Sequence, residues 1–180
     1  MKNAKRYLAV LVCAALVTVS CGREATTAPG GEMSNDLLGG TLGTVTGTLK
    51  NVLGTLLKCN QLPYAANRAI IGSAGGTLTV GPHTLVVPRG ALSGPTLISA
   101  EAPRDNNRTV SFSPEGLRFA KPASLTMSYS GCSLVVGLLP RIAYTSDNLV
   151  ILSYVPSINN LFGQTVTGQL QHFSRYAAAW

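Results

Sequence analysis

Charged and aromatic residues are both scarce in this chain. Asp, Glu, Lys and Arg make up 12% of the 180 residues, and Phe, Trp and Tyr make up 6%. The basic residues beyond the first six positions are scattered, and few aromatics alternate with them. The sequence therefore offers neither a dense cationic stripe nor a stacking platform for bases. We expect no binding of nucleic acid, although the formal net charge is +7.

Histidine and cysteine are also few. The two histidines and four cysteines show no metal-ligand spacing, so we expect no metal site and no cofactor. The sequence contains no nucleophile elbow, phosphate-binding loop or outstanding carboxylate pair, which argues against the commonest hydrolase and nucleotide chemistries. Glycine (19), proline (10) and hydrophobic residues (46%) are abundant. With the low charge, this composition is typical of an all-β domain.

The first 20 residues are predicted to form an export signal. Three basic residues within the first six positions precede an apolar run from Tyr7 to Val19. That run is shorter than the roughly 20 residues that a membrane span needs. A positive start, a short apolar run and small residues after it are typical of a cleaved secretory signal. The sequence therefore predicts export.

The segment Thr18-Val19-Ser20-Cys21 resembles the bacterial lipobox, in which the cysteine thiol is acylated and becomes the new amino terminus. Val19, Ser20 and Cys21 match that pattern, whereas Thr18 stands where leucine is usual. We expect a lipid on Cys21 to anchor the chain to a membrane of the bacterial cell envelope. Ordinary signal cleavage nearby is the alternative, and it would give a secreted or periplasmic soluble protein.

Two segments separate this site from the main domain. Residues 21–35 are small and polar, and they are predicted to form a flexible tether. Residues 36–65 are rich in glycine and leucine. Apolar residues recur every three or four positions between Asp36 and Lys58, which predicts an amphipathic helix. Its five glycines each cost about 1 kcal/mol relative to alanine. We interpret it either as an interfacial or self-associating element or as a spacer lying on the domain.

Two cysteines remain after the signal and the lipid site. Cys13 leaves with the signal, and Cys59 and Cys132 are then predicted to form a disulfide in an oxidising compartment. Closing a loop of this length stabilises a fold by up to about 4–5 kcal/mol on the entropic model. The bond would pin the end of the glycine- and leucine-rich segment to the loop around Cys132.

Residues 66–180 show short β-type runs separated by turn residues. Thr77–Val80 and Thr84–Val87 flank the turn Gly81-Pro82, and Leu78 and Val80 share one face of the first run. Such alternation is typical of a half-buried strand. Further strands are expected at 69–71, 96–101, 108–112, 117–119, 124–128, 141–145, 149–155, 165–170 and 171–179. Many short strands at near-regular spacing predict an antiparallel β-sandwich.

Two stretches of this domain carry an ordered set of motifs. The first, GGTLTVGPHTLVVPRGAL, contains Gly75-Gly76 and Pro88-Arg89-Gly90-Ala91, and the second, FSPEGLRFAKPASLTMSY, contains Ser113-Pro114, Gly116-Leu117, Phe119 and Lys121-Pro122. Together they resemble the ZU-five domain, the module shared by zonula occludens proteins, Unc-5-type netrin receptors and ankyrins and found in bacterial envelope lipoproteins. The resemblance covers roughly residues 70–180. It implies a β-sandwich that serves protein–protein contact.

Turn chemistry agrees with these motifs. Gly90 and Gly116 stand where turns favour a positive φ, and Pro88 and Pro122 are expected to mark strand ends because proline has no backbone donor. His83 is expected to start a strand. We expect Glu101 and Asp105 to be solvated charges.

Near the carboxyl end, His172-Phe173-Ser174 matches the tripeptide at which some eukaryotic members of this family cleave themselves. The resemblance implies that Ser174 Oγ attacks the Phe173 carbonyl while His172 takes the hydroxyl proton, since imidazole titrates nearest neutral pH. Water would then open the ester. A final strand with Phe173 in the core explains the same segment without catalysis. The sequence favours the strand, and we expect no enzyme.

These patterns predict an exported, lipid-anchored envelope protein whose sandwich is a protein-interaction or structural module. Its partners are expected to be other envelope proteins. Two alternatives stay open: a self-cleaving protein cut between Phe173 and Ser174, and an envelope module that binds a ligand or glycan through exposed aromatics at one end of the sandwich.

Overall fold

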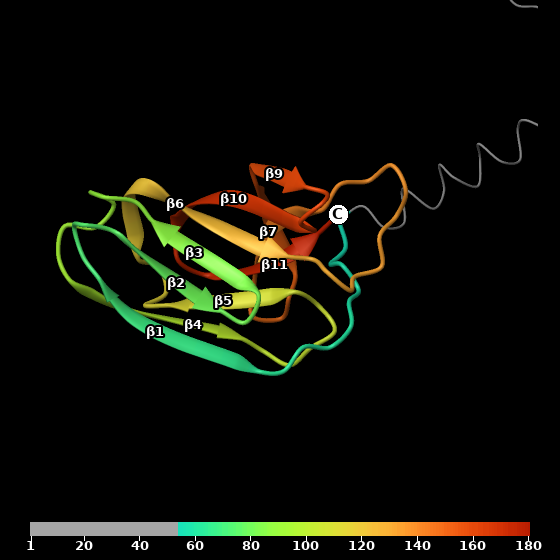
Figure 1. Cartoon of the computed structure of the whole chain (residues 1–180), viewed down its shortest axis with the longest axis horizontal. Helices are drawn as coiled ribbons and strands as arrows, with labels where there is room; N and C mark the ends of the chain where they lie inside the picture. Colours follow the sequence, from blue (N-terminus) through green and yellow to red (C-terminus); the bar gives the residue numbers. More distant parts are fainter. Residues whose placement is uncertain (1–53) are drawn as a thin grey trace, which may run out of the picture. The chain divides into compact units, whose positions relative to one another are not determined.

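A computed structural model describes residues 54–180, and Figure 1 shows their course. The predicted signal, the tether, Cys21 and residues 36–53 of the glycine- and leucine-rich segment lie outside the described residues. The described part is all-β, as the sequence predicts, and none of its elements is a helix. It accordingly contains no helix of the length and hydropathy that crossing a membrane would need.

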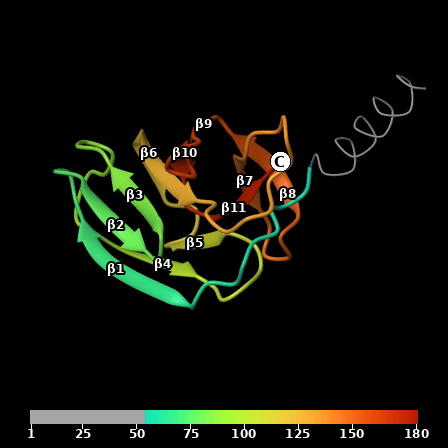
Figure 2. The ribbon, with the colours of Figure 1, turned by 45° about the vertical axis from the view of Figure 1, so that its right-hand side comes forward.

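The strands form two antiparallel sheets that pack against each other as a β-sandwich (Figures 1 and 2). The six-stranded sheet has the order β1-β4-β5-β11-β7-β8, and the five-stranded sheet has the order β2-β3-β6-β10-β9. The strands are β1 Ala65–Ile71, β2 Gly76–Val80, β3 His83–Val87, β4 Thr96–Ala102, β5 Thr109–Ser113, β6 Arg118–Ser128, β7 Arg141–Thr145, β8 Ile151–Val155, β9 Ser157–Asn160, β10 Thr165–His172 and β11 Arg175–Ala179.

The β2–β3 hairpin shows why the local sequence gives this structure. Leu78 and Val80 are buried, whereas Thr77 and Thr79 are exposed, as the alternation predicts. Gly75 immediately precedes the first strand of the hairpin, and its φ is +77°. A Cβ atom at this position would lie 2.5 Å from the Val87 carbonyl oxygen, so that both the conformation and the space require glycine. Gly90 and Gly116 also have positive φ, which confirms the prediction for both.

Strand β6 corrects the prediction that Pro122 marks a strand end. The strand runs continuously from Arg118 to Ser128 and passes through Pro122. Its ladder with β10 is irregular at this point, because the register shifts between Leu170 and His172. Proline is tolerated where a bulge interrupts the ladder, since no backbone donor is needed there.

Other boundaries also differ from the predictions. β1 starts at Ala65, four residues before the predicted strand, and β8 starts at Ile151 because Leu149 has a φ of +61° in the preceding turn. The short, polar strand β9 is missed by the sequence pattern altogether. The predicted last strand, 171–179, is also wrong at its start. β10 extends to His172, and β11 begins only at Arg175.

The core lies between the two sheets. Leu78, Val80, Val87 and Phe173 are all buried in one hydrophobic cluster, as expected for a sandwich with one interior. The Phe173 ring stacks on Phe112 at 5.0 Å between centroids and meets Phe119 edge-on at 4.9 Å. Such a group of three rings, drawn from both sheets, contributes buried apolar area as well as favourable ring geometry.

Residues 54–64 form an extended arm that joins the sandwich before β1 begins. Leu57 is fully buried, Leu56 bridges to Ala179, and Gly54 donates its N–H to the Trp180 carbonyl. The predicted helix therefore does not reach Lys58, because the last residues of its apolar stripe are bound in extended form by the end of β11. The arm belongs to the sandwich.

Candidate functional site

The arm is fixed to the sandwich at Cys59. A disulfide joins Cys59 to Cys132, as the sequence predicts. Two backbone hydrogen bonds of 2.8 Å flank it, from Asn60 N to the Gly131 carbonyl and from Ser133 N to the Lys58 carbonyl. The bond closes a loop with a sequence separation of 73. It thereby ties the start of the described chain to the loop between β6 and β7.

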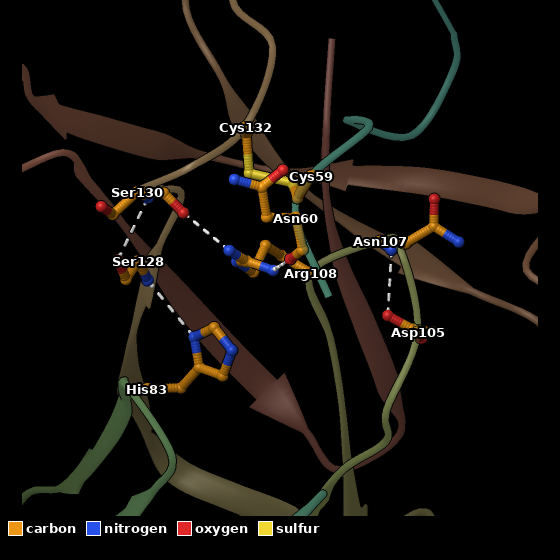
Figure 3. The surroundings of a disulfide bond; sticks show 9 residues. All are labelled: Cys59, Asn60, His83, Asp105, Asn107, Arg108, Ser128, Ser130 and Cys132. Carbon is orange, nitrogen blue, oxygen red and sulfur yellow. Dashed lines mark hydrogen bonds between the residues drawn. A yellow bond between two sulfur atoms is a disulfide. The ribbon is translucent and has the colours of Figure 1, made fainter. Parts of the chain in front are cut away.

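Arg108 makes a second connection between the same two segments (Figure 3). Its guanidinium donates from Nη1 to the Asn60 carbonyl and from Nη2 to the Ser130 carbonyl, both at 2.6 Å. Arg108 is 3% exposed. Burial lowers its pKa, and the nearby Asp105 carboxylate acts in the opposite direction. A buried guanidinium bound to one carbonyl on each side holds the arm and the loop in a fixed relation.

His83 lies beside this arginine, at the start of β3 as expected. It is 1% exposed, and its Nδ1 accepts a hydrogen bond of 3.3 Å from Ser128 N. Burial, and secondarily the positive charge of Arg108, lower its pKa to about 4. His83 is therefore neutral at physiological pH. Its burial and its contact with Ser128 were not evident from the sequence.

Asp105 is not the freely solvated charge that we expected, whereas Glu101 is exposed. The Asp105 carboxylate accepts hydrogen bonds from Asn107 N at 3.0 Å and from Thr109 Oγ1 at 2.7 Å. These bonds shape the turn that leads into β5 and so position Arg108. The Asp-x-Asn pattern in the sequence is typical of such a turn.

The predicted tripeptide lies at the opposite end of the sandwich, in the connection between β10 and β11. Those strands belong to different sheets, so Phe173 and Ser174 carry the chain from one sheet to the other. Three backbone hydrogen bonds fix this connection. Phe173 N donates to Leu117 O at 2.8 Å, Gly116 N to Phe173 O at 2.9 Å, and Phe112 N to Ser174 O at 3.1 Å.

The Phe173 carbonyl, the group that self-cleavage would attack, has two polar neighbours. Besides the Gly116 N–H, His172 Nδ1 lies 3.2 Å from its oxygen. The His172 carbonyl accepts a hydrogen bond of 2.6 Å from the Tyr176 hydroxyl, and burial raises the pKa of Tyr176 far above its usual value. Within the described residues, no hydrogen bond joins His172 to Ser174 Oγ. The imidazole faces the carbonyl and not the hydroxyl.

An open cavity of about 280 Å³ lies over this connection. His172, Phe173 and Ser174 line it together with Glu115 and Arg118. Gly116, on the loop before β6, supplies the N–H that points at the Phe173 carbonyl. The sequence indicated Gly116 only as a turn glycine. Its position opposite the tripeptide follows from the pairing of β6 with β10.

Within residues 54–180, no three histidine, cysteine or acidic side chains gather closely enough to hold a metal ion. A scan against protein-family models and a search of curated proteins returned no match to the chain. Two places thus stand out on geometry alone: the end of the sandwich that holds the disulfide and Arg108, and the β10–β11 connection.

Proposed function

We propose that the chain is an exported protein of the bacterial envelope, anchored through a lipid on Cys21, whose sandwich is a protein-interaction module related to ZU-five domains. The Cys59–Cys132 disulfide is the observation that carries the proposal. Such bonds persist in oxidising compartments and are rare in the cytosol. The lipobox-like sequence ends 38 residues before Cys59 in the same chain, on a tether suited to hold a domain near a membrane.

The sheet edges support an interaction role. Each sheet ends in two edge strands, β1 and β8 in one and β2 and β9 in the other. Edge strands present backbone groups to which an extended segment of another protein can add. The ligand- or glycan-binding alternative stays a prediction.

Metabolic labelling with palmitate tests the anchor. We expect the wild-type protein to be labelled and Cys21→Ala to be unlabelled. Alkylation of free thiols before and after reduction, followed by a gel-shift assay, tests the compartment in the same cells. We expect a shift at Cys59 and Cys132 only after reduction. An unlabelled wild-type protein would contradict the proposed lipid anchor. Thiols of Cys59 and Cys132 that react without prior reduction would contradict the proposed export.

Self-cleavage between Phe173 and Ser174 is a second candidate, because one specific observation favours it. The Phe173 carbonyl sits in a connection between sheets and accepts the Gly116 N–H at 2.9 Å, which is the type of donor that stabilises a developing oxyanion. Ser174 Oγ would bond to the carbonyl carbon, and the Ser174 nitrogen would leave with a proton carried by His172. The resulting ester would be opened by water to free a carboxylate on Phe173.

Intact-mass analysis under denaturing conditions decides this candidate. Denaturation is needed because β11 pairs with β5 and β7, so that a cut fragment of residues 174–180 would stay bound. We expect loss of that fragment from the wild type, acceleration by hydroxylamine and an intact mass for Ser174→Ala. A wild type that stays intact after long incubation with hydroxylamine removes the candidate without affecting the proposed envelope role.

A further inference from the structure

We propose that the disulfide end of the sandwich docks directly on a lipid bilayer through a cluster of exposed apolar side chains, here termed the loop patch. The loop patch consists of residues from the β6–β7 loop, strand β9 and the β9–β10 turn. They are 47% to 103% exposed: Leu134, Val136, Leu139, Ile158, Leu161 and Phe162. The inference rests on the proposed envelope location, and it adds a surface and an orientation that the anchor alone does not supply.

Hydrogen bonds hold the parts of the loop patch together. The β6–β7 loop is tied to β9 and its turn at both ends. Tyr129 N donates to the Gln164 carbonyl at 2.8 Å, and Asn159 Nδ2 donates to the Pro140 carbonyl at 2.7 Å. These bonds place the loop and the turn next to each other at the disulfide end. Figure 1 shows the β6–β7 loop beside the carboxyl end of the chain.

The most prominent members project fully into solvent. Val136 is 96% exposed and Phe162 is 103% exposed, and both lie on loops, not on a sheet face. Contiguous exposed apolar groups are uncommon on soluble monomers and mark sites of interaction with a protein or a membrane. Separate apolar tips on two loops fit insertion into the headgroup region of a bilayer better than they fit a flat protein surface.

The course of the chain selects the bilayer as the occupant. Residues 1–53 precede Gly54, which is bonded to the Trp180 carbonyl at this same end. Ser133, the residue before Leu134, donates its N–H to the Lys58 carbonyl of the arm. The segment that leads back to the proposed lipid site therefore leaves the sandwich beside the loop patch. A lipid on Cys21 would therefore be connected to the domain at the end that carries the loop patch.

Charge agrees with this choice. Lys58, Arg104 and Arg141 are exposed at this end and outnumber its two acidic residues, Glu101 and Asp105. Exposed cations near a membrane surface are attracted to anionic headgroups. Apolar tips flanked by cations are the combination that interfacial binding uses.

Fluorescence quenching in membranes tests the proposal on the full chain reconstituted in vesicles. We introduce Phe162→Trp as a probe and Ile70→Trp as its matched control, because Ile70 is also strongly exposed (72%) but lies on β1 near the opposite end. With brominated lipids we expect about twofold quenching of the Phe162→Trp signal and little quenching at position 70. Equal quenching at both positions would overturn the proposal.

A binding assay provides an independent measurement. In flotation with vesicles of phosphatidylcholine containing about 30% phosphatidylglycerol, the double variant Val136→Asp/Phe162→Asp should bind about tenfold less than the wild type. The matched double variant Ile70→Asp/Val150→Asp, whose two positions are exposed and do not pair with each other, should bind as the wild type does. Thermal unfolding of both variants should be unchanged, because all four side chains are exposed.

Other occupants would give different results. Concentration-dependent dimers in the absence of vesicles, dissociated by Val136→Asp/Phe162→Asp, would assign the surface to a second copy and overturn the proposal. The proposed lipid anchor is tested separately, because its failure would appear as an absence of palmitate label on the wild-type protein. The flotation comparison between the two double variants stays decisive in that case, because both variants carry the same residues 1–53.

Discussion

Arg108 donates its Nη1 to the carbonyl of Asn60 at 2.6 Å, one residue beyond the cysteine that forms the disulfide. The same guanidinium reaches Ser130 on the opposite segment. The arm and the β6–β7 loop are thus joined twice, once covalently and once through a buried cation. If this end faces a membrane, as we propose, both connections keep its loops in place.

Removing the disulfide should destabilise the sandwich. We expect Cys59→Ser/Cys132→Ser to lower the free energy of unfolding by about 2–4 kcal/mol, since a loop with a separation of 73 residues is no longer closed in the unfolded chain. Urea denaturation of the wild type, with and without reductant, and of the double variant measures this loss. A wild type that unfolds at the same urea concentration in both conditions would contradict it.

Removing Arg108 should have a comparable effect. Arg108→Met leaves the Asn60 and Ser130 carbonyls without their buried donor, so we expect a loss of about 2–4 kcal/mol. The matched control Arg104→Met changes an exposed arginine and should stay within about 0.5 kcal/mol of wild type. A double-mutant cycle with the cysteine variant measures how far the two connections support each other. Equal stability of the two methionine variants would refute the role of Arg108.

Stability should fall as the pH drops below about 6.5. The pKa of His83 is about 4 in the folded protein and has its ordinary value of 6.5 when unfolded, so the unfolded state binds more protons between these values. The neutral His83 therefore causes no loss of folding stability above pH 6.5. Between pH 6.5 and pH 4, up to about 3 kcal/mol of the free energy of unfolding is lost. Urea denaturation at several pH values between 4 and 7 measures how steeply the free energy of unfolding changes with pH.

The variants for this pH experiment are matched. His83→Gln should flatten the slope, and His172→Gln should keep it because His83 is retained. Arg108→Met should raise the pKa of His83 by removing a neighbouring positive charge. If the stability of His83→Gln still falls with pH as steeply as that of the wild type, the pH dependence comes from other titratable groups.

Gly75 should tolerate no side chain. In Gly75→Ala, a Cβ would meet the Val87 carbonyl at 2.5 Å with φ at +77°, and we expect a loss of at least about 2 kcal/mol. Gly94→Ala is the matched control, since a Cβ there has no neighbour within 4 Å. Thermal unfolding compares the two. Similar melting temperatures would show that the β1–β2 turn can rearrange.

Phe173 should be a main contributor to the core, whether or not its peptide bond is cut. Phe173→Ala removes a fully buried ring that contacts Phe112 and Phe119, which costs about 3–5 kcal/mol. Phe162→Ala removes an exposed ring and should change stability by less than about 0.5 kcal/mol. Denaturant titration of the two variants should therefore separate them clearly. A small loss for Phe173→Ala would mean that the core refills the space.

Local chemistry made much of this fold predictable. Alternation in β2 indicated which of its residues are buried, and Gly90 and Gly116 indicated their turns. β9 was missed because a run of four residues with a single apolar side chain, Ile158, shows no hydrophobic alternation. β6 was divided because proline usually ends a strand. The break between β10 and β11 was predicted too early, at 170–171, because the alternation of side chains continues through His172, Phe173 and Ser174 while the chain changes sheets. Cys59 and Cys132 were predictable as a pair, whereas the two bonds of Arg108 were not.

The sequence by itself determined the all-β class, the main hairpin and the pairing of Cys59 with Cys132, because these depend on side-chain alternation, turn residues and composition. Only the tertiary structure decided that Arg108 and His83 are buried neighbours, that Gly116 meets the Phe173 carbonyl, and that apolar loops gather beside the arm. The physical reason is that these relations join residues far apart in the chain. They are set by sheet pairing and packing, which local sequence patterns do not encode.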